Sequence, residues 1–363
     1  MMNVEERLKK ITRNTEEIIT LNELREILRT KKHPKAYWGF EPSGLMHLGT
    51  GLVCGYKILD MVKSGFDFTI FLADWHAWIN NKLGGNLEDI RFCGEYLIHG
   101  FSSIGLTPDK VKYVWASELL KNTDYWETVV KIAKKISVPR VTRCLPIMGR
   151  ELNVQEIEAA SLFYPCMQVA DMFKLEVDCA CSGLDQRKAH MLARDVAEKF
   201  SLKKPLSLHT HLLLGLSGPA EKMGTQFDEN EAINLQISAK MSKSLPKSCI
   251  YVHDSPDEIR EKIKDAYCPQ KQVEDNPVLE VAKYIVFAKD EQLLVERSQK
   301  YGGSVEFLSY EDLKRTYADG KLHPLDLKNS VTEALIHILE PVRKHFEKKS
   351  ELVERMAKID ISR

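Results

Sequence analysis

The sequence lacks an excess of charge of either sign. Its 363 residues carry 52 Lys plus Arg and 52 Asp plus Glu, so the formal net charge is zero. This balance excludes a disordered polyelectrolyte and a uniformly basic nucleic-acid coat protein, although it leaves room for a local basic face. No stretch comes near the ~18 uninterrupted apolar residues of a transmembrane helix, and the charged start, MMNVEERLKKITRN, lacks the apolar core of a secretory signal. We therefore expect a cytoplasmic chain without a membrane partner.

The eight cysteines lack the spacing of a metal or disulfide framework. No C-x-x-C pair is repeated, and Cys and His do not cluster, so we expect no metal bound by the protein itself. Cys179 and Cys181 alternate within an apolar run, where a strand would put both on one face. Two small buried side chains explain this pair better than a redox or metal role. Internal repeats and low-complexity tracts are also missing.

What the sequence does contain is a globular composition over a length typical of two domains. Hydrophobic residues make up 44% and charged residues 29%, which allows a sizeable core. Apolar strands alternate with helical patterns over most of 35–250, which predicts an α/β domain with a Rossmann-like parallel sheet. Helical patterns dominate after about residue 250. We therefore predict a first domain over 1–251 and a helical C-terminal domain over 252–363.

Periodicity and turn residues place the individual elements. Strands are expected at 35–40, 67–79, 110–117, 177–183 and 206–218. Helices are expected at 45–62, 88–103, 124–136, 155–173 and 186–200, after an amphipathic helical lead-in over 1–32. Ligands of open α/β sheets bind beyond the carboxyl ends of the strands, so the loops after strands should carry the chemistry.

Two segments stand out at such places. The first, FEPSGLMHLGTG (40–51), joins a predicted strand to a predicted helix, where small residues and helix N–H groups can receive phosphate and His47 can donate to its oxygens. The second, KMSKS (240–244), holds two ammonium groups and two hydroxyls and can neutralise a leaving pyrophosphate. Either segment alone is more often a structural turn or a solvated loop. Their combination within one α/β chain favours a polyphosphate site.

HLG in the first segment and KMSKS in the second are similar to the two signatures of class I aminoacyl-tRNA synthetases. YWGFEPSG, YPCMQVAD, GLDQRKAHM, AYCP and HPLDLKNSV further resemble the tyrosyl-tRNA synthetases of the archaeal and eukaryal type. These matches run in order from about residue 35 to 345. The resemblance implies a ligase that makes tyrosyl-adenylate from L-tyrosine and ATP and then esterifies the 3′ end of tRNA(Tyr).

The resemblance also implies a set of tyrosine-binding residues. Tyr37 and Asp171 resemble the pair that hydrogen-bonds the substrate phenol. Such a buried pair disfavours phenylalanine because its polar groups stay unpaired, an effect for which tyrosyl-tRNA synthetases are themselves the standard worked example. Without the resemblance, a core aromatic and a helix-surface carboxylate would be the preferred interpretations of the two. The other expected contacts to the amino acid are Glu41, Tyr164, Gln168 and Gln186, with Tyr164, Gln168 and Asp171 on one helical face.

On the ATP side, the resemblance assigns catalysis to His47, Lys240 and Lys243, with Mg²⁺ accompanying the nucleotide. The remaining positions expected to line the ATP site are Gly39, Gly49, Thr50, Gly183 and Asp185. Thr50 departs from the family pattern because it replaces the second signature histidine and cannot carry a positive charge. The stretch 217–238 is longer than expected, and no function is assigned to it.

The resemblance makes the helical domain an anticodon-binding domain and the protein a homodimer, with no DNA partner. The residues expected to stack on or hydrogen-bond anticodon bases are Tyr301, His323, Pro324 and Asp326. An aromatic in a Gly-rich turn and an ordinary helix start explain the same residues about equally well. An insertion at about 110–170 is expected to hold the dimer contact and acceptor-stem phosphate contacts.

Two rivals stay open at this point. A tryptophanyl-tRNA synthetase shares the fold and both signatures, but it would read an indole N–H and has no need of the Tyr37 and Asp171 pair. A catalytically silent RNA-binding paralogue would not need an intact KMSKS loop or amino-acid pocket. A plain nucleotidyltransferase shares the first turn but does not explain the helical C-terminal part.

Overall fold

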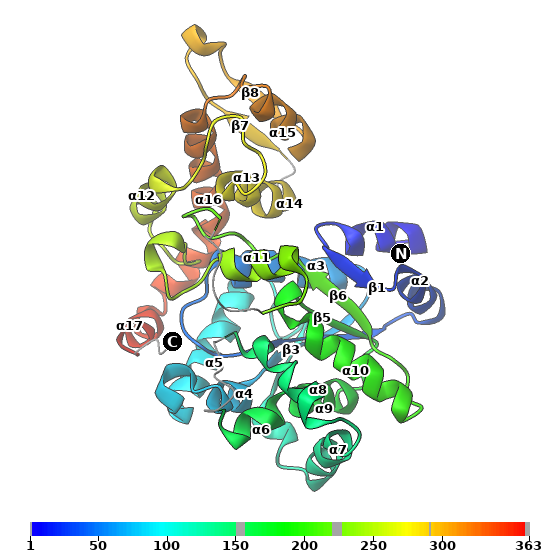
Figure 1. Cartoon of the computed structure of the whole chain (residues 1–363). Helices are drawn as coiled ribbons and strands as arrows, with labels where there is room; N and C mark the ends of the chain where they lie inside the picture. The colour runs from blue at the N-terminus through cyan, green and yellow to red at the C-terminus, as the bar shows by residue number, and fades with distance from the viewer. Residues whose placement is uncertain (1, 150–156, 220–226, 290–291, 360–363) are drawn as a thin grey trace.

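The computed structural model describes residues 2–149, 157–219, 227–289 and 292–359. Its centre is a six-stranded sheet in the order β1-β6-β5-β2-β3-β4 (Figure 1). Its strands are β1 (Glu17–Ile19), β2 (Lys35–Phe40), β3 (Asp67–Leu72), β4 (Lys112–Trp115), β5 (Cys179–Gly183) and β6 (Leu206–Thr210). All pairs are parallel except β1 with β6. The chain passes from β2 outward to β3 and β4 and then returns to β5, so the strand order reverses beside β2.

The sheet is buried on both faces. Along β2, Ala36, Trp38 and Phe40 join one apolar core, whereas Tyr37 joins a second core on the opposite face. This alternation follows from the two-residue period of a strand. The first core includes α3 (Cys54–Lys63) and α5 (Leu87–Ser103), and the second includes α7 (Thr123–Ala133), α9 (Phe163–Lys174) and α10 (Arg187–Lys199). Because both faces are covered by helices, only the strand ends remain open for a ligand.

The helices of the sheet region follow most of the predicted positions. Their bounds are α1 (Val4–Thr12), α2 (Leu21–Thr30), α3 (Cys54–Lys63), α4 (Asp74–Ile79), α5 (Leu87–Ser103), α6 (Ala116–Leu119), α7 (Thr123–Ala133), α8 (Val138–Thr142), α9 (Phe163–Lys174), α10 (Arg187–Lys199) and α11 (Glu231–Ala239). A π-helical turn over Gly49–Val53 leads into α3. No helix among the described residues is long and apolar enough to cross a membrane.

Several element predictions were wrong in detail. The predicted strand 110–117 ends at Trp115, and the predicted helix 45–62 begins only after His47, which forms an antiparallel bridge with Tyr251. The predicted strand 67–79 ends at Leu72, and α4 follows, because the Asp74 carboxylate accepts hydrogen bonds from the Trp75 and Ser117 N–H groups, both at 3.0 Å. The lead-in is not wholly helical, since β1 interrupts it and pairs antiparallel with β6. The predicted strand 206–218 ends at Thr210, and the predicted helix 155–173 is α-helical only from Phe163. Residues 155 and 156 lie outside the described residues.

The C-terminal part is mainly helical, as predicted, and it adds one small hairpin. Its elements are α12 (Pro256–Asp265), α13 (Pro277–Val281), α14 (Phe287–Lys289), β7 (Leu293–Val295), β8 (Val305–Phe307), α15 (Tyr310–Ala318), α16 (Pro324–Glu347) and α17 (Ser350–Lys358). Figure 1 shows the hairpin and α15 at the end of this part farthest from the sheet. The part shares the first apolar core with β2 and α5. It therefore packs directly on the sheet region.

Candidate active site

A cavity of about 900 Å³ opens beyond the carboxyl ends of β2, β5 and β6, beside the point where the strand order reverses. It is lined by every residue predicted to bind the amino acid or the nucleotide. These residues are Tyr37, Gly39, Glu41, His47, Gly49, Thr50, Tyr164, Gln168, Asp171, Gly183, Asp185, Gln186, Lys240 and Lys243. They come from segments spread over about two hundred residues of sequence, so only the fold brings them together.

A buried carboxylate lies at one side of this cavity. Asp171, on α9, accepts a hydrogen bond from the Tyr125 hydroxyl at 2.7 Å, and its other oxygen lies 3.2 Å from His76 Nε2. Burial is the largest single effect on His76 and would lower its pKa, but the charge and hydrogen bond of Asp171, together with the charges of Glu41 and Asp74, outweigh it and raise that pKa. Burial, followed by the charge of Asp171, raises the pKa of Tyr37 well above its ordinary value. The Tyr37 hydroxyl has no hydrogen-bond partner among the described residues, so it is available to a ligand.

The two side chains that contact Asp171, Tyr125 and His76, were not predicted as site residues from the sequence. Tyr125 lies on α7, where it reads as an ordinary core aromatic, and it is fully buried. His76 falls within the segment 67–79, which the sequence predicts as a strand, and a strand would not turn its side chain toward α9. In the structure, His76 lies in the first turn of the short helix α4.

A second polar group surrounds Glu41. The Tyr164 hydroxyl donates to Glu41 Oε1 at 2.6 Å, and Asn80 Nδ2 donates to the same carboxylate at 3.1 Å. Gln168 Nε2 lies 3.4 Å from Gln186 Oε1, and Gln186 in turn donates to the Ile147 carbonyl at 2.8 Å. This arrangement offers a carboxylate and amide oxygens to a ligand ammonium group.

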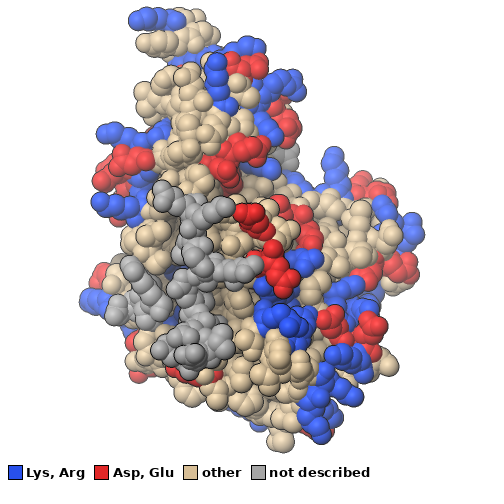
Figure 2. Space-filling view, in the orientation of Figure 1, with Lys and Arg blue, Asp and Glu red and all other residues tan. Residues whose placement is uncertain are grey.

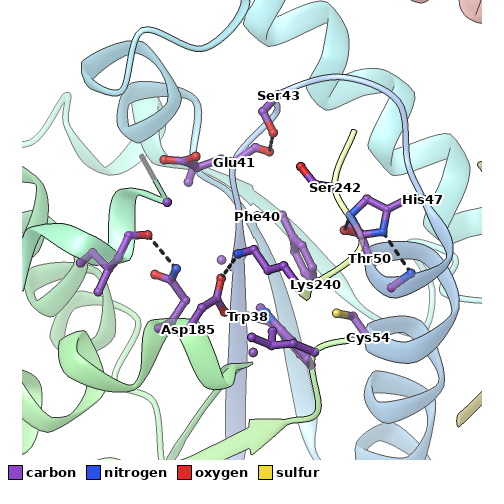
Figure 3. A pocket seen from close by; sticks show the side chains of 18 of the residues that line it. Trp38, Phe40, Glu41, Ser43, His47, Thr50, Cys54, Asp185, Lys240 and Ser242 are labelled. Atoms are coloured by element: carbon purple, nitrogen blue, oxygen red, sulfur yellow. Dashed lines mark hydrogen bonds and ion pairs between the residues drawn. The ribbon is translucent and has the colours of Figure 1, made fainter. Parts of the chain in front are cut away.

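The first signature turn presents a neutral histidine. The Gly49 N–H donates to His47 Nδ1 at 3.1 Å, so the ring proton belongs on Nε2, which lies 3.2 Å from Thr50 Oγ1 (Figure 3). Burial, followed by the charges of Lys243 and Lys240, lowers the pKa of His47 to about 3. The ring is therefore an uncharged donor at neutral pH. Thr50 does not replace the missing positive charge, but it orients this ring.

The two lysines of the KMSKS loop contact different residues of the cavity wall. Lys240 Nζ lies 2.6 Å from Asp185 Oδ2, and Lys243 Nζ donates to Ser43 Oγ at 2.9 Å (the Lys240 contact is drawn in Figure 3). Met241 between them is buried and its N–H donates to the Leu213 carbonyl at 2.7 Å. The loop is thus anchored by its middle residue while both ammonium groups face the cavity.

A third cation, Lys82, lines the same cavity and was missed in the sequence. Burial is the main cause that lowers the pKa of Lys243, and the charge of Lys82 adds to it. Lys82 stands alone after α4, with no pattern around it that points to a ligand. Close packing also shapes the cavity wall beside Asp185, because a Cβ on Gly183 would lie 2.6 Å from Asp185 Oδ1.

The stretch 217–238 leads into the KMSKS loop. Asn230 caps α11, which runs to Ala239 directly before Lys240. Lys188 Nζ donates to the Phe227 carbonyl at 2.8 Å, and Phe227 lines the cavity. The described part of this stretch therefore holds the loop against α10. Residues 220–226 lie outside the described residues.

The residues predicted to contact the anticodon do not line the cavity. Tyr301 is the last residue of the short turn between β7 and β8 and is 63% exposed. His323 caps α16 by accepting from the Leu325 N–H at 3.1 Å, with Pro324 and Asp326 in the first turn. Arg297 donates to the carbonyls of Gly303 and Lys321 at 2.7 and 3.0 Å, so it ties the Tyr301 turn to the segment before α16.

The parallel sheet, the histidine turn and the paired-lysine loop define a class I tRNA synthetase. Comparison with protein families supports this class, since the model for class I tRNA synthetases (W and Y) matches residues 29–340. A tyrosine–tRNA ligase of Sulfurisphaera tokodaii is 48% identical, and the match covers 98% of each chain. The chain belongs to the tyrosine–tRNA ligase family and is an aminoacyl-tRNA ligase.

Among the solved structures that match, tyrosyl-tRNA synthetases are more similar to this chain than tryptophanyl-tRNA synthetases are. The tyrosyl-tRNA synthetase of Pyrococcus horikoshii, solved with L-tyrosine, matches with a TM-score of 0.88 and 43% identity over 99% of this chain and 100% of that one. The tryptophanyl-tRNA synthetase of Aeropyrum pernix matches with a TM-score of 0.68 and 19% identity over 93% of this chain and 84% of that one. At this identity, the match with the tryptophanyl enzyme shows only that the two proteins share a fold.

Proposed function

We propose that this chain binds L-tyrosine and ATP in the described cavity, forms tyrosyl-adenylate there and passes the tyrosyl group to tRNA(Tyr). One observation carries the proposal. The buried Asp171 carboxylate, held by Tyr125 and His76, shares a cavity with Lys240 and Lys243. A site that offers both an acceptor for a phenol and cations for a triphosphate fits a tyrosine-activating ligase.

In the proposed complex, Tyr37 and Asp171 hold the substrate hydroxyl. Asp171 accepts from the phenol, and the unpaired Tyr37 hydroxyl donates to it. Glu41 and Tyr164, together with Gln168 and Gln186, receive the α-ammonium group. Because the two polar groups lie at different places in the cavity, they also fix which way the amino acid points.

The adenylation step needs no general base. A carboxylate oxygen of tyrosine forms a bond to the α-phosphorus, the bond from that phosphorus to the bridging oxygen breaks, and pyrophosphate leaves with the bonding electrons. The protein aligns these atoms and neutralises the leaving group, which is how most phosphoryl-transfer sites work. His47 donates through Nε2–H, and Lys240 and Lys243 neutralise the charge. Gly39, Gly49, Thr50, Gly183 and Asp185 line the nucleotide side.

Mg²⁺ enters this scheme as part of the ATP substrate. Among the described residues, no group of three or more His, Cys, Asp or Glu side chains could hold a metal ion. The Asp185 carboxylate that faces the nucleotide side is already paired with Lys240. Phosphate oxygens and water are the usual main ligands of Mg²⁺ in such sites, and this donor set suits that arrangement.

The proposed tRNA contacts lie in both parts of the chain. Residues 252–363 serve as the anticodon-binding domain and 1–251 as the catalytic domain. Tyr301 is exposed, with Lys300 Nζ 5.5 Å from the centre of its ring, and it can stack on a splayed base. Asp326 can accept a hydrogen bond from a base amino group.

Figure 2 shows Lys and Arg side chains gathered at the lower right, near α10, among acidic ones. The zero net charge therefore accommodates a local basic surface for phosphates.

The dimer contact is proposed at about 110–170. Three large apolar side chains within this range are exposed, with Val130 on α7 52% exposed, Val138 on α8 66% and Phe163 on α9 47%. Exposed apolar side chains are typical of subunit contacts. A cytoplasmic location fits the eight cysteines, which are all free.

The test is ATP–pyrophosphate exchange with tyrosine, tryptophan and phenylalanine in turn. We expect exchange that depends on tyrosine alone. Exchange with tryptophan would favour the tryptophanyl alternative. Loss of exchange with all three amino acids would favour a silent RNA-binding paralogue.

A further inference from the structure

A carboxylate from the helical C-terminal part reaches the backbone beside the catalytic loop. Glu280, on α13, accepts a hydrogen bond from the Leu214 N–H at 2.8 Å through Oε2, and its Oε1 lies 3.0 Å from His211 Nε2. The Glu280 side chain is only 19% exposed. Hydrogen bonds from a backbone N–H to an ionised carboxylate are among the stronger ones in proteins.

Leu214 lies in the short segment 213–215, which pairs with residues 239–241 at the start of the KMSKS loop. Leu214 and Lys240 form an antiparallel bridge. On either side of it, the Met241 N–H donates to Leu213 at 2.7 Å and the Gly215 N–H donates to Ala239 at 2.9 Å. The backbone of 213–215 therefore sets where the Lys240 side chain begins.

His211 holds the same carboxylate from its other oxygen. The imidazole lies between Glu280 and Glu16, and Glu16 Oε2 is 3.5 Å from His211 Nδ1. The imidazole also stacks on the Tyr284 ring, with 4.4 Å between the ring centroids and an interplanar angle of 9°. Because His211 holds Oε1 of Glu280, the other oxygen, Oε2, points at the Leu214 N–H. Three parts of the chain, namely the segment before β1, the end of β6 and α13, thus meet at one place.

We propose that Glu280 is a positioning residue for the KMSKS loop, so that α13 of the helical part sets the rate of tyrosine activation without touching a substrate. Glu280 does not line the cavity, whereas its partner His211 does. The proposed route to the chemistry runs through Leu214 to Lys240, and Glu16→Ala, below, tests the route through His211. The proposal rests on the proposed function, because it takes Lys240 to act on the phosphates. Positioning errors of about 1 Å can cost roughly 100-fold in rate, so the loss of this contact has a measurable effect.

The test compares three variants of the full chain in tyrosine-dependent ATP–pyrophosphate exchange. Glu280→Ala removes the Leu214 contact, and we expect kcat to fall at least tenfold while the KM for tyrosine changes less than twofold. Glu280→Gln keeps an amide oxygen for the Leu214 N–H and should stay within threefold of the unaltered kcat. Glu16→Ala is the matched control, because it removes the other carboxylate of His211 and leaves the Leu214 contact in place.

A double-mutant cycle separates positioning from general destabilisation. If Glu280 acts through Lys240, then Glu280→Ala should lower kcat less than twofold in a chain that already carries Lys240→Ala. Should Glu280→Ala fail to fold, Glu280→Asp replaces it, since its shorter side chain keeps the charge near His211 but does not reach Leu214.

The proposal is overturned if Glu280→Ala leaves kcat unchanged, if it raises the KM for tyrosine in step with the fall in kcat, or if its full effect persists without Lys240. It is also overturned if Glu16→Ala lowers kcat as much as Glu280→Ala. A lack of tyrosine-dependent exchange in the unaltered protein would instead overturn the proposed function itself.

Discussion

The Lys243 ammonium group donates to the Ser43 hydroxyl at 2.9 Å, although the two residues are 200 positions apart. Ser43 belongs to the turn after β2, and Lys243 belongs to the KMSKS loop. The fold therefore joins the two segments that the sequence singled out. Because Lys243 is held by a neutral hydroxyl rather than a carboxylate, it can move to a phosphate without giving up an ion pair.

Lys243→Ala should lower the rate of tyrosyl-adenylate formation by roughly 100-fold or more, the usual size for the loss of one group that stabilises transition-state charge. Tyrosine affinity should barely change, since Asp171 and Glu41 are untouched. Exchange kinetics and equilibrium tyrosine binding measure the two quantities. Lys247→Ala removes the same charge from an exposed position outside the cavity and serves as the control. An unaltered rate in Lys243→Ala would exclude this role.

Tyr125→Phe should weaken tyrosine binding. It removes the donor that holds Asp171 at 2.7 Å, and a hydrogen bond to a charged group contributes about 1.5–3 kcal/mol, or roughly 10- to 100-fold in the KM for tyrosine. The KM for ATP should change little. Tyr113→Phe is the control, because the Tyr113 hydroxyl donates to the Leu106 carbonyl outside the cavity. Equal effects of the two variants on the KM for tyrosine would contradict the assignment.

Thr50→Val should lower kcat by roughly 3- to 10-fold, since a neutral hydrogen bond contributes about 0.5–1.5 kcal/mol. The change keeps the side-chain shape but removes the hydroxyl that lies 3.2 Å from His47 Nε2. Thr50→Ser keeps the hydroxyl and should behave like the unaltered protein in the same exchange assay. If Thr50→Val and Thr50→Ser were equally active, Thr50 would have no part in orienting His47.

Stability should fall as the pH rises toward 9 because of His211. Burial alone would lower the pKa of His211, but its ion pairs with Glu16 and Glu280 raise it to about 9. A group with a raised pKa stabilises the folded state fully below its ordinary pKa of about 6.5 and loses this effect as the pH passes 9, here up to about 3 kcal/mol. The other groups that face it are Tyr284 and, near Glu16, Lys283.

Urea unfolding at pH 6.5 and pH 9.5 measures this effect. His211→Gln should reduce the difference between the two free energies of unfolding, whereas His337→Gln, whose side chain is 80% exposed, should not. An unchanged pH dependence in His211→Gln would show that other groups control stability in this range.

Val130→Asp combined with Val138→Asp should convert a homodimer to monomers. Both side chains are more than half exposed on the proposed contact face, at 52% and 66%, and a buried unpaired charge there would be costly. Sedimentation velocity gives the oligomeric state. Leu308→Asp, at a 70% exposed position in the helical part, is the control. A monomeric unaltered protein would contradict the dimer directly.

Local sequence determined much of the fold. The apolar runs at 35–40 and 177–183 predicted β2 and β5, because a strand buried on both faces needs such side chains along its whole length. The Ser255-Pro256 start with Glu258 predicted α12, and the capping box is present there. These patterns depend on neighbours within one or two turns, so they can be recognised without the rest of the chain.

Tertiary structure alone decided the contacts that complete the site. Tyr125 meets Asp171 across 46 residues and Glu280 meets Leu214 across 66, and no local pattern marks either partner. Ile18 and Ile19 favour a strand, but a segment of three residues becomes β1 only because β6 lies beside it and pairs with it. Sequence patterns report the side chains that a segment presents, whereas a hydrogen bond between distant segments depends on the packing that places its two atoms within reach.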